Sequence, residues 1–356
     1  MRHLLLSFVP LALAAQVMTI EEYEPRSTLV VPLSAIERAR FPFIDVHNHQ
    51  RSSMGPEELQ RLVADMDRIN MRLMVNLSGG TGERLRQTVR LLSAYPDRFA
   101  VFANIDFAGV DEPDFGERIA RRLEQDVAAG ARGLKIFKNF GMTLKDSQGR
   151  RIPVDDARFD RLFETCGRLK IPVLIHTGEP KALFDPMDKY NERWLELKLF
   201  PSRARPPGEY PRFEELLAEQ HRLFARHPKT IFLNAHLGWL GNDLAALGRL
   251  LDRLPNVYTE FGAVIEEIGR QPRFARDFFI RYQDRILFGK DTWRPQEYIT
   301  YFRVLETADE YFDHDRKYHG LWKLYGLDLP PEVLKKVYYK NALRIVPGLN
   351  RDGFPD

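Results

Sequence analysis

Short apolar runs alternate with amphipathic helical stretches eight times along this chain of 356 residues. The runs are rich in β-branched and aromatic residues, as buried strands are, and the stretches between them repeat apolar residues at helical spacing. Strand and helix alternating eight times is the pattern of a (β/α)8 TIM barrel. The expected strands are residues 43–49, 72–78, 99–107, 133–138, 172–178, 230–238, 257–263 and 285–291.

A doubly wound open sheet is the alternative α/β architecture. Such a sheet usually carries a glycine-rich phosphate loop, with the spacing G-x-G-x-x-G, after an early strand. The sequence "SGGTGER" at residues 78–84 lacks this spacing and follows the second expected strand. We therefore expect one barrel domain over residues 40–348, with a leader at 16–39 before it and a tail at 349–356 after it.

The first fifteen residues have the pattern of a secretory signal peptide. Arg2 precedes an apolar run from Leu4 to about Leu13, and the small residues Ala14 and Ala15 offer a cleavage site. The apolar run is too short to cross a bilayer as a helix. The sequence thus predicts a signal peptide at 1–15, no membrane span, and an exported protein that is periplasmic or secreted.

Charge and cysteine content exclude two classes of function. The 53 basic and 50 acidic residues are spread along the chain and leave a net charge of only +3, so nucleic acid is not an expected partner. Cys166 is the single cysteine, which excludes an intramolecular disulfide and a cysteine-based zinc site. A small-molecule substrate is the expected partner, and a homo-oligomer is possible.

Polar side chains gather where the expected strands end. His47 and His49 share one face of the first strand, because successive side chains of a strand point to opposite sides. Other strand ends carry Lys135, His176, His236, Glu260 and Asp291. In a TIM barrel the C-terminal ends of the strands form the active-site face. Paired imidazoles beside further ligand-type side chains predict a metal site there.

Four short sequences at these strand ends resemble the amidohydrolase superfamily, and in particular its metal-dependent branch that contains both hydrolases and decarboxylases. They are "DVHNH", "VLIHTGEP", "NAHLG" and "ILFGKD". The resemblance covers about residues 40–348 and includes "VYYKNALRIV", which is similar to the closing helix of that branch. Lys290 is a departure, since many relatives have threonine before the aspartate.

The resemblance implies that His47, His49, His176 and Asp291 bind one divalent ion. Zinc suits three imidazoles and a carboxylate, and manganese, iron or cobalt would also fit. An open coordination position would hold a water and lower its pKa, and Asp291 is expected to take the proton of that water. His236 is expected to polarise the substrate or to act as a general acid or base; the alternative is that it only orients other groups.

Two further inward-facing residues, Asp45 and Lys135, are expected to support the metal. Asp45 should hydrogen-bond a ligand imidazole. In binuclear relatives a lysine at the position of Lys135 is carboxylated and, with His176 and His236, holds a second ion. The alternative is an unmodified ammonium that binds an acidic substrate or pairs with a carboxylate such as Glu260.

A long segment follows the fifth expected strand, at residues 177–216. It exceeds the usual βα loop of about 2–6 residues and is expected to form a lid over the metal. Arg203 or Arg205 could hold a substrate carboxylate, or both could be solvated. Trp293, close after Asp291, is expected in the pocket wall. The substrate is expected to be anionic, because these arginines or Lys135 could bind its acidic group.

The sequence favours a metal-dependent hydrolase that uses a metal-activated water on a small ester, lactone or amide. The alternative is a decarboxylase that uses the same metal site on an unsaturated or aromatic carboxylic acid. A barrel that only binds a ligand is the third reading, and the ligand-type residues at so many strand ends argue against it.

Overall fold

The structure is a computed structural model that describes residues 18–355. The chain divides into two compact units, Met1–Val31 and Pro32–Asp356. In the described part of the first unit, the amides of Glu22 and Tyr23 donate to the carbonyl of Thr19 and form a turn. The signal peptide expected at residues 1–15 lies outside the described residues, and export stays a prediction.

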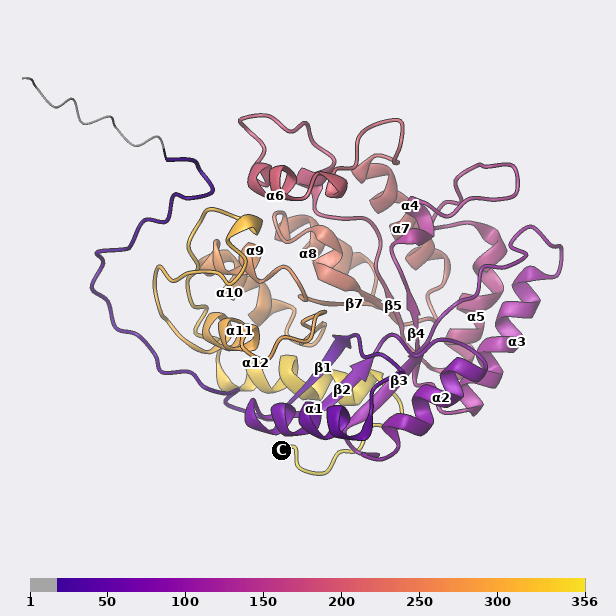
Figure 1. Cartoon of the computed structure of the whole chain (residues 1–356). Coiled ribbons are helices and arrows are strands. Elements are labelled where there is room, and N and C mark those ends of the chain that lie inside the picture. Colours follow the sequence, from indigo (N-terminus) through magenta and orange to yellow (C-terminus); the bar gives the residue numbers. More distant parts are fainter. Residues whose placement is uncertain (1–17, 356) are drawn as a thin grey trace, which may run out of the picture. The chain divides into compact units, whose positions relative to one another are not determined.

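Eight parallel strands form one sheet, and each strand pairs with the next along the chain (Figure 1). The first and last strands also meet, because the amide of Val46 donates to the carbonyl of Phe288 (3.0 Å) and the amide of Asp291 to that of His47 (2.6 Å). The fold is therefore the expected TIM barrel. The strands are β1 Phe43–Asn48, β2 Met71–Asn76, β3 Phe99–Ala103, β4 Gly133–Ile136, β5 Val173–Ile175, β6 Phe232–Asn234, β7 Val257–Glu260 and β8 Ile286–Leu287.

The strands end earlier than the apolar runs suggest, most clearly in β6 and β8. Beyond β6 the backbone of His236 is left-handed, with a φ of 58°, and beyond β8 that of Asp291 has a φ of 80°. A residue with a positive φ cannot continue an extended strand. The chain thus turns away from the sheet at the residues that carry the functional side chains.

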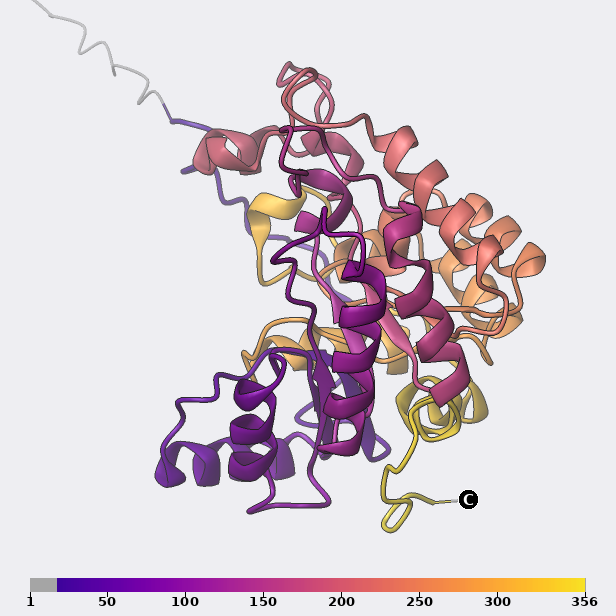
Figure 2. The ribbon, with the colours of Figure 1, turned by 90° about the vertical axis from the view of Figure 1, so that its right-hand side faces the viewer.

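Helices surround the strands on the outside of the barrel, and α3 and α5 pack side by side (Figure 2). The α-helices are α1 Pro56–Arg68, α2 Glu83–Leu92, α3 Phe115–Ala128, α4 Asn139–Met142, α5 Asp160–Leu169, α6 Trp194–Leu199, α7 Phe213–Arg226, α8 Leu244–Arg253, α9 Ile265–Gly269, α10 Pro272–Arg281, α11 Glu297–Glu306, α12 Pro331–Lys335 and α13 Asn341–Ile345. Short 3-10 helices lie at η1 Ala157–Phe159, η2 Lys181–Leu183, η3 Pro201–Arg203, η4 Ala235–Trp239 and η5 Lys317–His319, and η6 Lys336–Lys340 is a π-helix.

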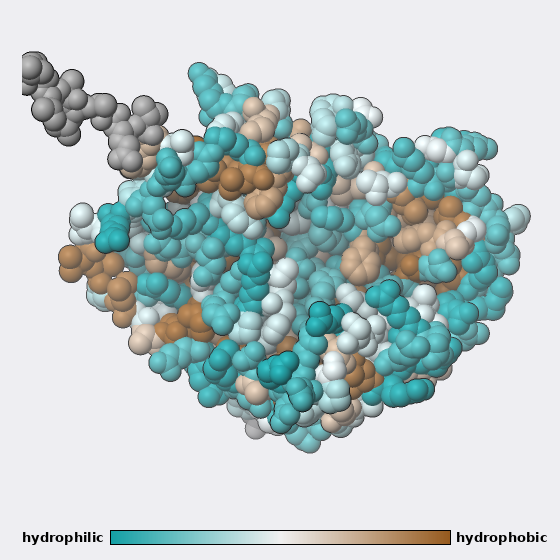
Figure 3. Space-filling model, in the orientation of Figure 1, coloured by the Kyte–Doolittle hydropathy of each residue, from teal (hydrophilic) through white to brown (hydrophobic). Residues whose placement is uncertain are grey.

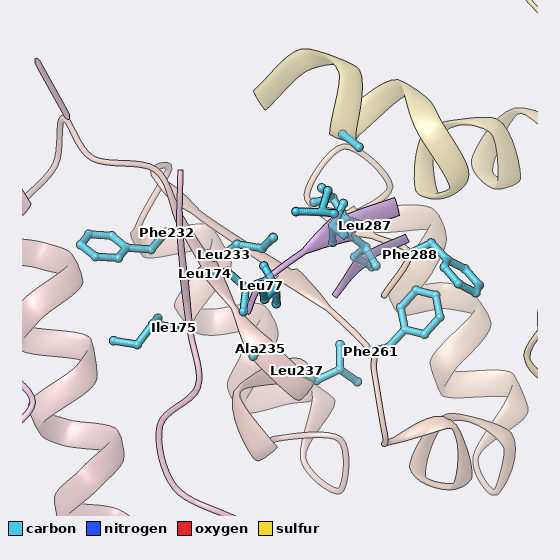
Figure 4. Packing of buried hydrophobic residues seen from close by; sticks show 14 of the residues in the cluster. Leu77, Leu174, Ile175, Phe232, Leu233, Ala235, Leu237, Phe261, Leu287 and Phe288 are labelled. Atoms are coloured by element: carbon cyan, nitrogen blue, oxygen red, sulfur yellow. The ribbon is translucent and has the colours of Figure 1, made fainter. Parts of the chain in front are cut away.

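Apolar side chains fill the barrel and the layer between strands and helices (Figure 4). Leu174 and Leu233 are fully buried. Lys135 on β4 is aligned with Leu174 on β5, which is in turn aligned with Leu233 on β6. Residues aligned in this way point to the same side of the sheet, so Lys135 lies inside the barrel, level with these leucines. The face of the molecule in Figure 3 is mostly hydrophilic, with scattered apolar patches. Among the described residues, none of the helices has the length and hydropathy that a membrane span requires.

The segments that flank the barrel pack against it. Ser34 donates to the carboxylate of Asp309 (2.7 Å), and the amide of Ala39 donates to the carbonyl of Ile69 (3.3 Å). Residues 32–39 therefore belong to the barrel unit, which begins before the limit of 40 that the strand pattern suggests. At the other end, the ring of Phe354 stacks on Tyr339 (5.1 Å between ring centroids).

The segment between β5 and α7, at residues 176–212, contains η2, α6 and η3 and lies at the top of Figure 1. Arg193 in this segment is 3% exposed and hydrogen-bonds the carboxylates of Glu196 (3.0 Å) and Glu266 (2.7 Å). A buried arginine paired in this way ties the segment to α9.

Candidate active site

Two imidazoles at the end of β1 converge on one carboxylate. His47 Nε2 and His49 Nε2 each lie 3.5 Å from Oδ1 of Asp291. The other ring nitrogens are already engaged, because His47 Nδ1 donates to Glu260 Oε1 (2.8 Å) and His49 Nδ1 hydrogen-bonds the hydroxyl of Ser78 (2.8 Å). Partners of this kind fix the orientation of metal-binding imidazoles and leave one nitrogen facing the ion.

His236 joins this group from the end of β6. His47, His236 and Asp291 each offer one ligand atom, and these three atoms lie within 4.8 Å of one another. His236 Nδ1 donates to the carbonyl of Gly262 (2.6 Å), so in the neutral ring Nε2 carries the lone pair. The indole of Trp239 stacks on the imidazole of His236, with 4.5 Å between ring centroids.

His176 at the end of β5 lies next to His236. Its Nδ1 is 3.2 Å from His236 Nε2, and since that nitrogen accepts, His176 Nδ1 donates. The remaining nitrogen, His176 Nε2, is buried and has no hydrogen-bond partner. A buried nitrogen lone pair without a partner is costly unless a ligand or ion satisfies it.

Of the four residues expected to bind metal, only His47 and Asp291 belong to the compact group with His236. His47 and Asp291 form its compact centre, His49 adjoins through Asp291, and His176 adjoins through His236. Neutral imidazoles and a carboxylate are suitable donors for a divalent transition metal. The donor set thus fits a divalent ion, with His236 closer to the centre than the expected ligand His176.

Burial keeps the imidazoles in the form that binds metal. Burial, and next the Lys135 ammonium, hold the pKa of His47 well below its ordinary value and lower the pKa of His49 to about 4. Burial raises the pKa of Asp291, but the neighbouring histidines outweigh it and hold this pKa below its usual value. At neutral pH the site therefore offers neutral nitrogen donors and an ionised carboxylate.

Lys135 lies beside the metal site inside the barrel. Its Nζ is 3.4 Å from His47 Nε2, and the residue is 1% exposed. Burial lowers the pKa of Lys135 to about 8, while the carboxylates of Asp291 and Glu260 act in the opposite direction. The expectation that Lys135 points inward agrees with this position; its carboxylation stays a prediction.

The expected partnership of Asp45 is wrong, and Glu260, the carboxylate named as one alternative partner of Lys135, has another partner. Asp45 does not hydrogen-bond an imidazole: its Oδ1 accepts from the amides of His47 (3.0 Å) and Lys290 (3.1 Å), and its Oδ2 from the hydroxyl of Tyr298 (2.6 Å). Asp45 lies a layer below the rings, where backbone amides of β1 and of the residues after β8, together with the hydroxyl of Tyr298, supply its donors. Glu260 pairs with His47 rather than with Lys135.

Glu260 is the supporting residue whose role the sequence did not indicate. It is fully buried, and its Oε1 accepts from both His47 Nδ1 (2.8 Å) and the amide of His236 (2.9 Å). Its position at the end of the seventh strand was the available signal, because an inward carboxylate there must find donors.

The residues proposed to contact substrate have other partners in this structure. Arg203 pairs with Glu196 (2.6 Å), and Arg205 pairs with Glu179 (2.8 Å), which also binds Lys138 (2.6 Å). Both arginines are thus paired rather than freely solvated, and a substrate contact stays a prediction. Trp293 is partly exposed and packs edge-on against Tyr298, with 5.5 Å between ring centroids.

Comparison with known proteins adds a family and a set of similar folds. The model of a family described as Amidohydrolase matches residues 35–348. No curated protein matches the sequence. An uncharacterised TIM-barrel protein from Bordetella bronchiseptica is 17% identical, with a TM-score of 0.54 over 85% of this chain and 97% of that one.

Two decarboxylases have similar structures. A dihydroxybenzoic acid decarboxylase from Polaromonas sp. JS666, solved with bound manganese and the inhibitor 2-nitroresorcinol, is 15% identical, with a TM-score of 0.53 over 86% of this chain and 96% of that one. A 5-carboxyvanillate decarboxylase from Sphingomonas paucimobilis is 15% identical, with a TM-score of 0.52 over 86% of this chain and 99% of that one. At these identities the likeness establishes the fold.

Proposed function

This chain belongs to the amidohydrolase family, and from that premise we propose that it is a metal-dependent decarboxylase of a small aromatic carboxylic acid. The observation that carries the proposal is the convergence of His47, His49 and Asp291 on one point beside the buried cation of Lys135. The similar decarboxylases, one of them with bound manganese, support this reading over the hydrolase that the sequence favoured. Manganese is accordingly the metal we propose in place of zinc.

The residues at the site would hold an acidic substrate by charge. When bound, the metal ion supplies positive charge that fixes and polarises a substrate oxygen. The Lys135 ammonium, fully enclosed by the barrel, adds a second positive charge within 3.4 Å of His47 Nε2. A carboxylate that enters this site exchanges its hydration for two cationic partners, which favours an anionic substrate over a neutral one.

Proton transfer is the chemical step that the protein side chains must provide. The carbon that bears the carboxylate gains a proton, the bond to the carboxyl carbon breaks with its electron pair left on that ring carbon, and CO₂ leaves. We assign the proton transfer to Asp291, whose side chain is 26% exposed: the ionised carboxylate takes a proton from solvent and then donates it to the ring carbon. His236, held by Gly262 through Nδ1, presents its Nε2 as the group that orients the substrate or shares the proton.

Hydrolysis is the second candidate, because the same donors and Asp291 would also suit activation of a water molecule. The test uses the full chain loaded with manganese and a panel of 2,6-dihydroxybenzoate, 5-carboxyvanillate, a lactone and an amide. Release of CO₂ from an aromatic acid, with one deuterium placed on the former carboxyl-bearing carbon in D₂O, supports the proposal. Hydrolysis of the lactone or amide without CO₂ release, or no turnover of any aromatic acid, overturns it.

A further inference from the structure

Phe137 is an apolar ring that remains exposed beside the metal site. It follows β4, where Leu134 and Ile136 are 1% exposed and face the helices, so alternation turns Lys135 and Phe137 to the inside. Lys135 is 1% exposed, whereas Phe137 is 37% exposed. The strand thus carries a buried cation and, one layer closer to the mouth, an accessible aromatic ring.

The neighbours of Phe137 place it at the site itself. Its ring centroid lies 5.7 Å from that of His49, and the Nζ of Lys135 lies 5.4 Å from the centre of the Phe137 ring. His49 is one of the imidazoles that face Asp291, with 3.5 Å between His49 Nε2 and Oδ1. A molecule that binds between Asp291 and Lys135 would therefore lie close to the ring of Phe137.

The exposure of Phe137 is not explained by packing of the barrel. Phe102 and Phe140 are both 0% exposed: Phe102 is aligned with Gly133 on the inner side of the barrel, and the ring of Phe140 packs against that of Phe159 (4.6 Å between ring centroids). Phe137 instead leaves more than a third of its surface exposed, although burying an apolar ring would gain stability. An aromatic ring with free surface next to a charged site is suited to contact another flat ring.

We propose that Phe137 determines specificity for aromatic acids by packing against the ring of the substrate while the carboxylate lies between the metal site and Lys135. This inference rests on the proposed function and adds the residue that would distinguish a flat ring from a saturated one. Aromatic pairs prefer offset-stacked or edge-to-face contacts and gain beyond simple area burial, which corresponds to about 3- to 10-fold in affinity.

The test compares benzoate with its saturated counterpart, cyclohexanecarboxylate. Their binding to the manganese-loaded full chain is measured by calorimetry for the wild type and for Phe137→Leu, Phe137→Tyr and Phe274→Leu. Phe274 on α10 is 50% exposed and serves as the control for loss of a surface ring. Metal content and thermal unfolding of each variant show that the site and fold are intact.

We expect the wild type to prefer benzoate, Phe137→Leu to reduce this preference about 3- to 10-fold, and Phe137→Tyr and Phe274→Leu to keep it. Equal affinities of the wild type for the two acids, or an unchanged preference in Phe137→Leu, would overturn the inference. Because binding is measured without turnover, a preference that depends on Phe137 stands even where no aromatic acid is decarboxylated. Conversely, decarboxylation with an unchanged preference would leave the proposed function and remove the role of Phe137.

Discussion

At the scale of single residues, Glu260 does most to position the proposed metal ligands. One carboxylate oxygen accepts from the ring of His47 and from the backbone of His236, which come from strands far apart in the sequence. Its second oxygen accepts from the amide of Gly262 (2.5 Å). A single buried side chain thus orients an imidazole of β1 and fixes the left-handed turn after β6.

Replacing Glu260 with Gln should weaken metal binding without unfolding the protein. The amide can occupy the same space, but it lacks the charge that orients and strengthens the His47 imidazole as a ligand. We expect manganese affinity to fall by about 10- to 100-fold. Titration with the metal measures this change, and Glu58→Gln, which alters an exposed pair with Arg51, is the matched control. An unchanged affinity would show that Glu260 does not support the site.

Asp291→Asn separates proton transfer from metal binding. Asparagine still offers an oxygen ligand, but it cannot exchange a proton, so turnover should fall by about 100-fold or more. Bound metal, measured by elemental analysis of the same sample, should fall much less. Near wild-type turnover with metal retained would exclude Asp291 as the group that moves the proton.

At the scale of elements, α9 carries two buried carboxylates with opposite behaviour. Burial and the neighbouring Glu266 raise the pKa of Glu267 to about 7, and the cations of Arg270 and Arg193 only partly oppose them. Burial also disfavours the ionised form of Glu266, but His319 and Arg193 outweigh it and lower the pKa of Glu266. The helix therefore holds one ionised carboxylate and one that retains its proton to near neutral pH.

Glu267→Gln should increase stability at pH 8 and change it little at pH 4.5. Because the folded pKa lies above the ordinary value of 4.5, the folded chain keeps a proton that the unfolded chain loses, and stability falls as the pH rises from about 4.5 to 7. Two to three pKa units correspond to about 3 kcal/mol, as an order of magnitude. Urea unfolding of both proteins across this range measures the difference.

Glu297 provides the opposite case for that experiment. Its pKa is lowered to about 2, because hydrogen bonds from Arg316 and Lys290 outweigh burial. Its contribution is therefore present above pH 4.5 and is lost as the pH falls, so Glu297→Gln should destabilise most at neutral pH. With rising pH, the Glu267→Gln substitution should become more stabilising and Glu297→Gln more destabilising. If the effects of both substitutions changed in the same direction with pH, the raised pKa of Glu267 would be wrong.

At the scale of the whole molecule, the proposed metal site joins the first and last strands and lies where the barrel closes. The amide of Asp291 donates to the carbonyl of His47, and Asp45 holds amides on both sides of this seam. An ion bound by His47 and Asp291 would link the same two strands. Metal binding should therefore stabilise the entire barrel and not only the site.

Removal of the metal should lower the melting temperature of the full chain. An ion that binds only the folded state adds about 2.7 kcal/mol at a free concentration 100 times its Kd. Thermal unfolding with manganese and after treatment with a chelator measures this difference. His47→Ala, which lacks a central donor, should lose most of the dependence on manganese. Equal melting temperatures of the wild type under both conditions would contradict a metal site at the seam.

The sequence alone determined the barrel and the residues that gather at its mouth. Eightfold alternation and strand periodicity are local patterns, and they place His47, His49 and Lys135 on one inner face. The family match over residues 35–348 and the paired order of all eight strands confirm the fold. These features are readable because each depends on residues only a few positions apart.

Tertiary structure decided how those residues are paired and aimed. Leu233 is aligned with the inward-facing Leu174, so regular alternation along β6 would turn Ala235 inward and His236 outward. His236 reaches the site because its backbone turns left-handed after β6. The pairing of Glu260 with His47 joins residues 213 positions apart, and Arg205 and Glu179 meet only because the segment after β5 folds back. Local sequence patterns carry the facing direction of a side chain within a strand, whereas its partners depend on which distant donors the closed barrel brings within hydrogen-bonding distance.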